Sequence, residues 1–159
     1  MGNDTVRRRK ATGRSAATYL GIPHYVVRSE EFGQLGAWEL KLLVELAAQY
    51  NGYNNGDFSA AMSILRSRGW HSTGTLSKAL AKLRDGGWIV TTRHGHRGGL
   101  CALYAVTWWP IDDCDGKWLE LPAERSARNT WQAAKKSISR HVNSDSRYVN
   151  SQPGELAKK

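Results

Sequence analysis

The chain has 159 residues, of which 40% are hydrophobic and seven are tryptophan, and this is enough for one domain with a packed core. Its formal net charge of +9 at pH 7 favours a polyanionic partner. Two cysteines exclude a disulfide framework, the first 20 residues lack the apolar segment of a secretory signal, and no stretch is apolar for long enough to span a membrane. These features predict a soluble, cytoplasmic protein that does not associate with membranes.

The charged residues are segregated along the chain. Residues 1–20 carry five basic side chains and one acidic side chain, and residues 121–159 carry eight basic and three acidic ones. Residues 58–100 carry seven basic side chains against Asp85 alone, although the charges of residues 21–120 sum to zero. The pattern indicates a globular domain with one basic flank and basic arms, whereas a requirement for solubility would explain only the total charge.

The first helix is expected after two non-helical segments. Residues 1–19 are polar and basic without apolar periodicity and are expected to be a disordered arm, and residues 22–27 (IPHYVV) are expected to enter the domain as an extended segment. Residues 35–50 carry an apolar stripe broad enough for a mostly buried helix. The Asn- and Gly-rich residues 51–57 then predict a helix stop and a turn.

Two further helices are predicted. A short one runs from Ser59, a candidate N-cap, to Gly69, and its inward face consists of Ala61, Ile64 and Leu65. The next helix starts after Ser72, another candidate N-cap, and continues through Arg84. Its apolar residues follow a one-sided helical spacing and are Leu76, Ala79, Leu80 and Leu83.

After the third predicted helix, the pattern of apolar residues changes from that of a helix to that of strands. Residues 88–93 and 100–109 are rich in β-branched and aromatic residues and predict a hairpin that ends at Pro110. Beyond Asp115 the chain is polar again, with a helix expected over 124–140 and disorder expected in the last twenty residues.

This order of elements, together with the stretch STGTLSKALAKLRDGGWIVTTRHGHRGGLCALYAVTW (72–108), resembles the winged helix-turn-helix family of DNA-binding proteins. The stretch NNGDFS (54–59) is similar to the opening of the same unit in members encoded by phages, plasmids and prophages. The resemblance covers about residues 22–112 and implies an α+β fold of three helices plus a β-hairpin wing, with flexible basic termini. The expected divisions are a disordered basic arm (1–19), a winged helix domain (20–116) and a basic tail that is partly helical or disordered (117–159).

The resemblance makes the third predicted helix the recognition helix. With its leucines committed to the core, its other side must face water and carries small, hydroxylated and basic residues. Small side chains allow close approach to a major groove, and lysines neutralise phosphates. An ordinary solvated helix face is the alternative interpretation. The residues on this side are Thr73, Gly74, Ser77, Lys78, Ala81 and Lys82.

The loop RHGHRGG between the two strands has three candidate roles. His94 and His96 could hold a metal with Cys101 or His71, but their spacing matches no zinc module and no Asp or Glu stands near the loop. A phosphate-cradling enzyme loop would be followed by a helix, whereas a strand follows here. We therefore interpret the loop as the tip of a wing, and an exposed turn without a function is the alternative. The DNA contacts expected there are Arg93, His94, His96 and Arg97. The expected contacts of the N-terminal arm are Arg7, Arg8, Arg9 and Lys10.

Most aromatic residues are interpreted as structural. Trp38, Trp70 and Trp88 are expected in the core. Trp108 and Trp109 are adjacent, so one is expected to be buried while the other covers an edge, a partner or single-stranded bases.

No catalytic set can be assembled, so we expect no enzyme activity, no cofactor and no metal. Cys101 is interpreted as a small core residue. The acidic residues that follow the hairpin are interpreted as a solvated loop, with a divalent-cation site as the alternative. They are Asp112, Asp113 and Asp115.

The predicted function is binding of double-stranded DNA, as a transcriptional regulator or replication accessory protein of a mobile element. The alternative is a protein-interaction module, a phage-type inhibitor or adaptor that binds a host protein through Trp118 and Trp131. Both a monomer and a homodimer are compatible with the sequence, which has no heptad pattern.

Overall fold

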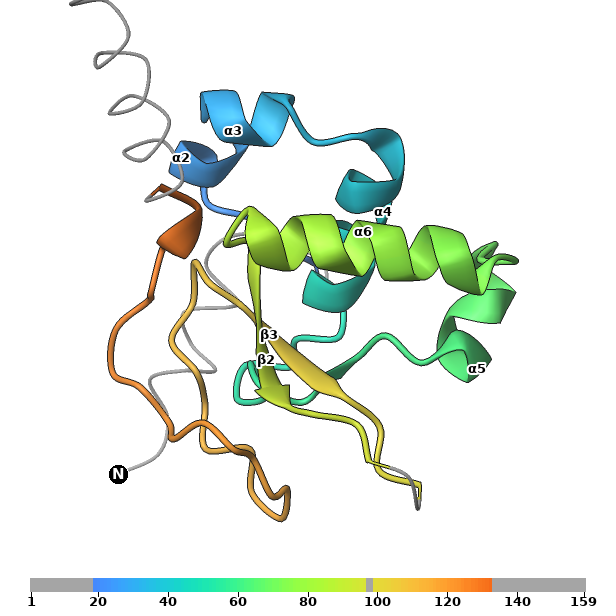
Figure 1. The fold of residues 1–159 in the computed structure, drawn as a ribbon. Coiled ribbons are helices and arrows are strands. Elements are labelled where there is room, and N and C mark those ends of the chain that lie inside the picture. Colours follow the sequence, from blue (N-terminus) through green and yellow to red (C-terminus); the bar gives the residue numbers. More distant parts are fainter. Residues whose placement is uncertain (1–18, 97–98, 133–159) are drawn as a thin grey trace, which may run out of the picture.

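The computed structural model describes residues 19–96 and 99–132 (Figure 1). This part of the chain has an α+β fold, which confirms the predicted class at that level. Its helices are α2 (His24–Val27), α3 (Glu30–Gly33), α4 (Ala37–Ala47), α5 (Met62–Leu65) and α6 (Thr73–Asp85), with short 3₁₀ helices η1 (Arg66–Arg68) and η2 (Thr130–Gln132). Its strands are β1 (Phe58–Ser59), β2 (Ile89–Arg93) and β3 (Leu103–Val106).

The strands form one antiparallel sheet in the order β1-β3-β2. The predicted hairpin is confirmed, because β2 and β3 pair from Ile89 opposite Val106 to Arg93 opposite Leu103. The prediction that Ser59 caps a helix is wrong. Ser59 pairs with Leu103 in β1, and α5 begins three residues later, after Ala61 at its N-cap.

The core lies between α4, α6 and the sheet. Figure 1 shows α6 crossing α4, with the hairpin leaving the C-terminal end of α6 and running to a tip below α5. The apolar stripes of both helices meet there, as their spacing predicts. The fully buried residues at this contact include Leu42, Leu43, Leu46 and Leu83.

The start of the domain differs from the expectation. Residues 22–27 were expected to be extended, but α2 occupies His24–Val27. Pro23 stands at the N-cap in an extended conformation, and its carbonyl accepts hydrogen bonds from the N–H groups of Val26 and Val27. Val26 is fully buried. Burial of this side chain therefore outweighs the preference of valine for strands.

Three apolar residues expected in the core are exposed. Ile64 is 47% exposed because α5 ends after one turn, so the spacing of a longer helix does not apply to it. Trp38 is 48% exposed and packs one face against Trp70, with ring centroids 5.2 Å apart. Cys101 precedes β3 and is exposed.

The other predictions for tryptophan are confirmed. Trp70 and Trp88 are buried. Trp108 is buried and Trp109 is half-buried, although both follow β3 in a turn instead of lying in the strand.

The chain after the hairpin returns to the domain. Trp131 is buried and stacks on Trp88 with ring centroids 5.0 Å apart and planes 5° apart, and it also stacks with Tyr25. The expectation that Trp131 is available to a partner is therefore wrong. Of the helix expected over 124–140, the described residues contain only η2. Within the described residues, no helix has the length and apolar character needed to cross a membrane.

Candidate nucleic-acid interface

Helix α6 is anchored on one side and open on the other. The Ser72 hydroxyl oxygen accepts a hydrogen bond from the Thr75 N–H at 3.2 Å, which confirms the predicted N-cap. The predicted inward stripe is also confirmed, since Leu76, Ala79 and Leu83 are buried and Leu80 is half-buried.

The outward side of α6 carries the predicted contact residues together. Each of them is exposed: Thr73, Gly74, Ser77, Lys78 and Lys82. Ala81, expected on the same side, is half-buried. The helix therefore presents small, hydroxylated and cationic groups to solvent along more than two turns.

Lys82 already has a partner within the protein. Its Nζ lies 2.9 Å from Oε1 of Glu39, in the first turn of α4, while its own side chain remains 71% exposed. The hydrogen bond from Lys82, helped by the backbone N–H of Glu39, lowers the pKa of the Glu39 carboxyl. The Glu39 carboxylate therefore balances part of the positive charge of Lys82.

A second group of basic residues lies directly before α6. Arg66 and Arg68 belong to η1, and both are exposed, as is His71. Gly69, with φ of 87°, turns the chain between η1 and α6. These three side chains are not among the contacts expected from the sequence, although Arg66 and Arg68 belong to the excess of basic residues within 58–100.

Arg93 does not lie at the tip of the hairpin, so this predicted position is wrong. The side chain is buried, and its Nε and Nη2 donate to the carbonyl oxygen of Cys101 at 3.1 and 3.0 Å. The pairing register shifts between Thr91 and Arg93, and such a bulge re-aims the side chains that follow it. Arg93 therefore links the two strands at the base of the loop.

The two histidines are exposed near the tip, as predicted, but they face a carboxylate. The backbone N–H of His94 donates to Glu120 Oε1 at 2.8 Å, and its Nδ1 lies 2.5 Å from Oε2. The Nε2 of His96 lies 3.9 Å from Oε1 of the same carboxylate. These contacts, that of the His94 side chain above all, lower the pKa of Glu120.

The prediction that no acidic residue stands near the loop is therefore wrong. Glu120 is far from the histidines in sequence, and only the return of the chain after the hairpin brings it there. Among the residues that the structure describes, no group of three or more His, Cys, Asp and Glu side chains could hold a metal ion. Arg97 and the arm residues Arg7, Arg8, Arg9 and Lys10 lie outside the described residues.

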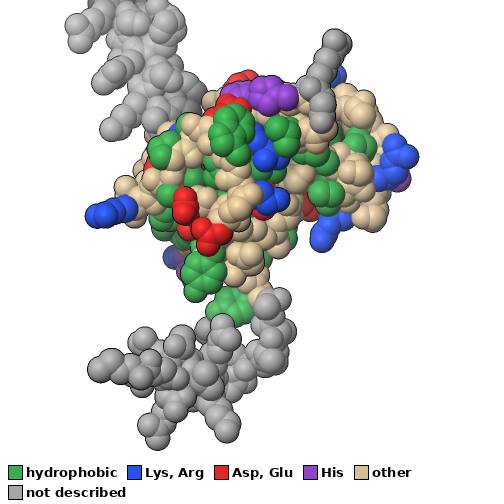
Figure 2. All heavy atoms as spheres, turned by 90° about the horizontal axis from the view of Figure 1, so that it is seen from below, with side chains coloured by type: hydrophobic (Ala, Val, Ile, Leu, Met, Phe, Trp, Pro, Cys, Tyr) green, Lys and Arg blue, Asp and Glu red, His purple; other side chains and the backbone are tan. Residues whose placement is uncertain are grey.

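The face of the molecule below the sheet does not resemble a polyanion-binding surface. In Figure 2, lysine and arginine side chains stand at separate places on this face, and acidic side chains gather left of its centre. A continuous basic patch would be expected where phosphates bind. Among the described residues, this view shows no such patch on the lower face.

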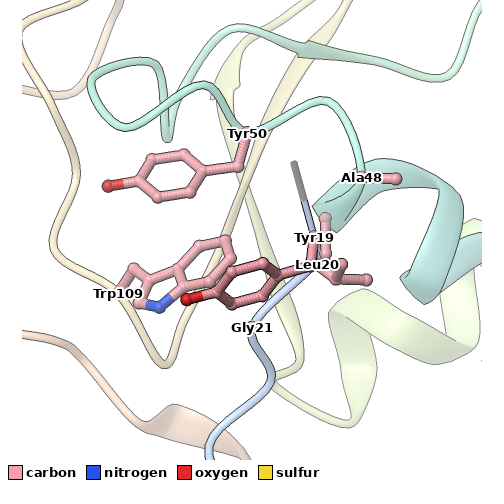
Figure 3. A pocket seen from close by; sticks show the side chains of 7 residues that line it. Tyr19, Leu20, Gly21, Ala48, Tyr50 and Trp109 are labelled. Atoms are coloured by element: carbon pink, nitrogen blue, oxygen red, sulfur yellow. The ribbon is translucent and has the colours of Figure 1, made fainter. Parts of the chain in front are cut away.

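A small pocket lies on another part of the surface (Figure 3). Its volume is about 220 Å³, and the rings of Tyr50 and Trp109 stack beside it with centroids 4.2 Å apart. Among the residues that the structure describes, no Asp, Glu, His, Lys or Arg lines it, so these residues present no acid–base pair for catalysis. The lining residues are Tyr19, Leu20, Gly21, Ala47, Ala48, Tyr50 and Trp109.

No family model, no curated protein and no solved structure matches this chain.

Proposed function

We propose that the chain is a winged helix-turn-helix protein that binds double-stranded DNA. The order of its elements supports this fold: α4, β1, α5, α6 and the β2–β3 hairpin follow one another as helix, strand, two helices and wing. The sheet order, with β3 between β1 and β2, is compatible with the same arrangement.

The observation that carries the proposal is the exposed side of α6. Its leucines are buried, so Ser77, Lys78 and Lys82 remain directed to solvent together with the N-terminal turn of the helix. In this proposal α6 enters the major groove, where small and hydroxylated side chains meet base edges and lysines meet phosphates.

The remaining cations would bind the DNA backbone on both sides of the groove. Arg66, Arg68 and His71 flank the start of α6 and are exposed. The wing would contribute His94, His96 and Arg97, and the arm would contribute Arg7–Lys10. The biological role that we propose is regulation of transcription, or assistance to replication, on a mobile element.

The test is a titration of mixed-sequence duplex DNA, followed by fluorescence anisotropy at several salt concentrations. The wild-type affinity should fall steeply as salt rises, because counterions are released from the phosphates. K78A should weaken binding by roughly threefold or more and reduce the salt slope by about one. K117A is the matched control, because Lys117 pairs with Asp57 away from α6 and its loss removes the same charge. Affinity that is independent of salt, or equal effects of K78A and K117A, would refute the proposal.

The alternative function is a protein-interaction module. The observation that favours it is Trp118, whose side chain is 61% exposed after the hairpin. Large exposed aromatic residues are common at protein interfaces. This alternative predicts a stoichiometric host protein that remains bound after nuclease treatment and is lost with W118A.

A further inference from the structure

The segment after the hairpin lies along the free edge of the sheet. Strand β2 is at the edge in the order β1-β3-β2, so the outer side of β2 has no strand partner within residues 19–96 and 99–132. The N–H of Glu120 donates to the carbonyl oxygen of Thr92 at 2.8 Å on β2. This backbone contact fixes Glu120 beside the base of the loop.

From that position the Glu120 side chain uses both of its oxygens on the loop. Oε1 accepts from the His94 N–H, and Oε2 contacts the His94 imidazole. Oε1 also faces the imidazole of His96 at 3.9 Å. A carboxylate oxygen and a phosphate oxygen are both anionic acceptors. The groups of His94 and His96 that contact Glu120 could therefore also bind a phosphate.

The contact between Glu120 and the two histidines is open to competing ligands. The Glu120 side chain is 29% exposed, and those of His94 and His96 are 67% and 57% exposed, so solvent and ligands reach all three. Ion pairs at such surfaces are weak, because water screens them and the side chains lose freedom. Beyond Arg93, an isolated bridge pairs His96 with Leu100 across the described part of the loop.

We infer that Glu120 is an internal competitor of DNA phosphate at the wing. It holds His94 and His96 against the returning chain, and the wing binds a phosphate only when that phosphate replaces the carboxylate. This inference rests on the proposed function, and it adds to that function an autoinhibitory contact.

The test compares E120Q with E124Q in the full chain. The E120Q amide keeps an acceptor for the His94 N–H but removes the negative charge from the wing. Glu124 lies in the same returning segment and pairs with Arg128, so E124Q removes an equal charge away from the loop. Binding of a mixed-sequence duplex is measured at low salt, after thermal melting has established that each variant is folded.

E120Q should bind the duplex roughly threefold or more tightly than the wild type and E124Q. The gain in duplex affinity that E120Q produces should be smaller by about half or more when H94Q is also present. In that background, the charge removal no longer frees a His94 imidazole for phosphate. Hydrogen exchange without DNA gives a second readout, and the amides of residues 94–96 should exchange faster in E120Q than in E124Q.

The outcomes distinguish competition by Glu120 from DNA binding itself. If E120Q binds no more tightly than E124Q while K78A still weakens binding, the competition is wrong and DNA binding stands. Unchanged exchange of residues 94–96 in E120Q would show that the carboxylate does not hold this part of the loop, whatever the DNA result. If neither the wild type nor E120Q binds duplex DNA, the competition falls with the proposed function.

Discussion

Lys82 in the last turn of α6 forms an ion pair with Glu39 in the first turn of α4, with Nζ and Oε1 2.9 Å apart. Each charge lies at the helix end that favours it, the cation at a C-terminus and the anion at an N-terminus. Among the described residues, no acidic side chain lies within ion-pair distance of Lys78, the other lysine on this side of α6. The two lysines therefore differ in what their loss would do.

K78A and K82A should separate affinity from stability. We expect K78A to weaken duplex binding more than K82A, because the charge of Lys82 is partly balanced by Glu39. K82A should in turn lower the free energy of unfolding by about 1 kcal/mol, because it leaves the buried carboxylate of Glu39 without its cation. Anisotropy titration and urea denaturation of both variants measure the two effects. A larger loss of affinity in K82A than in K78A would show that the ion pair with Glu39 does not weaken the contribution of Lys82 to DNA binding.

The pH dependence of that pair follows from the lowered pKa of Glu39. A carboxyl whose pKa is lower in the folded state stabilises the fold above its unfolded pKa, and the stabilisation is lost as the pH falls through the folded value. The difference in unfolding free energy between wild type and K82A should therefore be present at neutral pH and vanish as the pH falls below the ordinary value of 4.5. E39Q should remove the difference at every pH. A difference that persists in acid would assign the effect of K82A to another contact.

Trp131 and Trp118 should respond in opposite ways to removal of the indole. Trp131 is 3% exposed and stacks with both Trp88 and Tyr25, so W131A should lower the free energy of unfolding by about 3 kcal/mol or more. W118A removes a side chain that is 61% exposed and should change stability by less than about 0.5 kcal/mol. Denaturant unfolding of the two variants makes the comparison. Equal stabilities would mean that the returning chain does not pack on the domain in solution.

Gly87 and Gly69 provide a matched pair for the contact that holds this segment. Both have positive φ, 71° and 87°, so alanine is strained at either position. A Cβ on Gly87 would lie 2.7 Å from the carbonyl carbon of Thr130, whereas one on Gly69 would meet nothing within 4 Å. G87A should therefore destabilise the protein by at least about 1 kcal/mol more than G69A. Chemical denaturation measures the difference, and a similar cost at both positions would contradict the close approach.

The parts of the fold that were predictable depend on neighbours in sequence. The spacing of Leu76, Ala79 and Leu83 predicts the buried side of α6 because residues three and four apart share a helix face. The serine before it predicts the cap, and the change to β-branched and aromatic residues predicts the hairpin. The exposed contact residues of α6 follow from the same periodicity.

Two of the incorrect predictions concern contacts between residues that are not neighbours in sequence. Strand β1 has two residues and exists because Phe58 pairs with Tyr104, which no local pattern announces. A bulge, and not the composition of the loop, turns Arg93 inward to Cys101.

The amino-acid sequence by itself determined which helix face is buried, where that helix begins and where the chain changes to strands, because each depends on the order of adjacent side chains. Only the tertiary structure decided that Glu120 contacts His94 and that Trp131 stacks on Trp88. The reason is that both contacts form where the chain folds back on itself, and their geometry is set by packing across the whole domain.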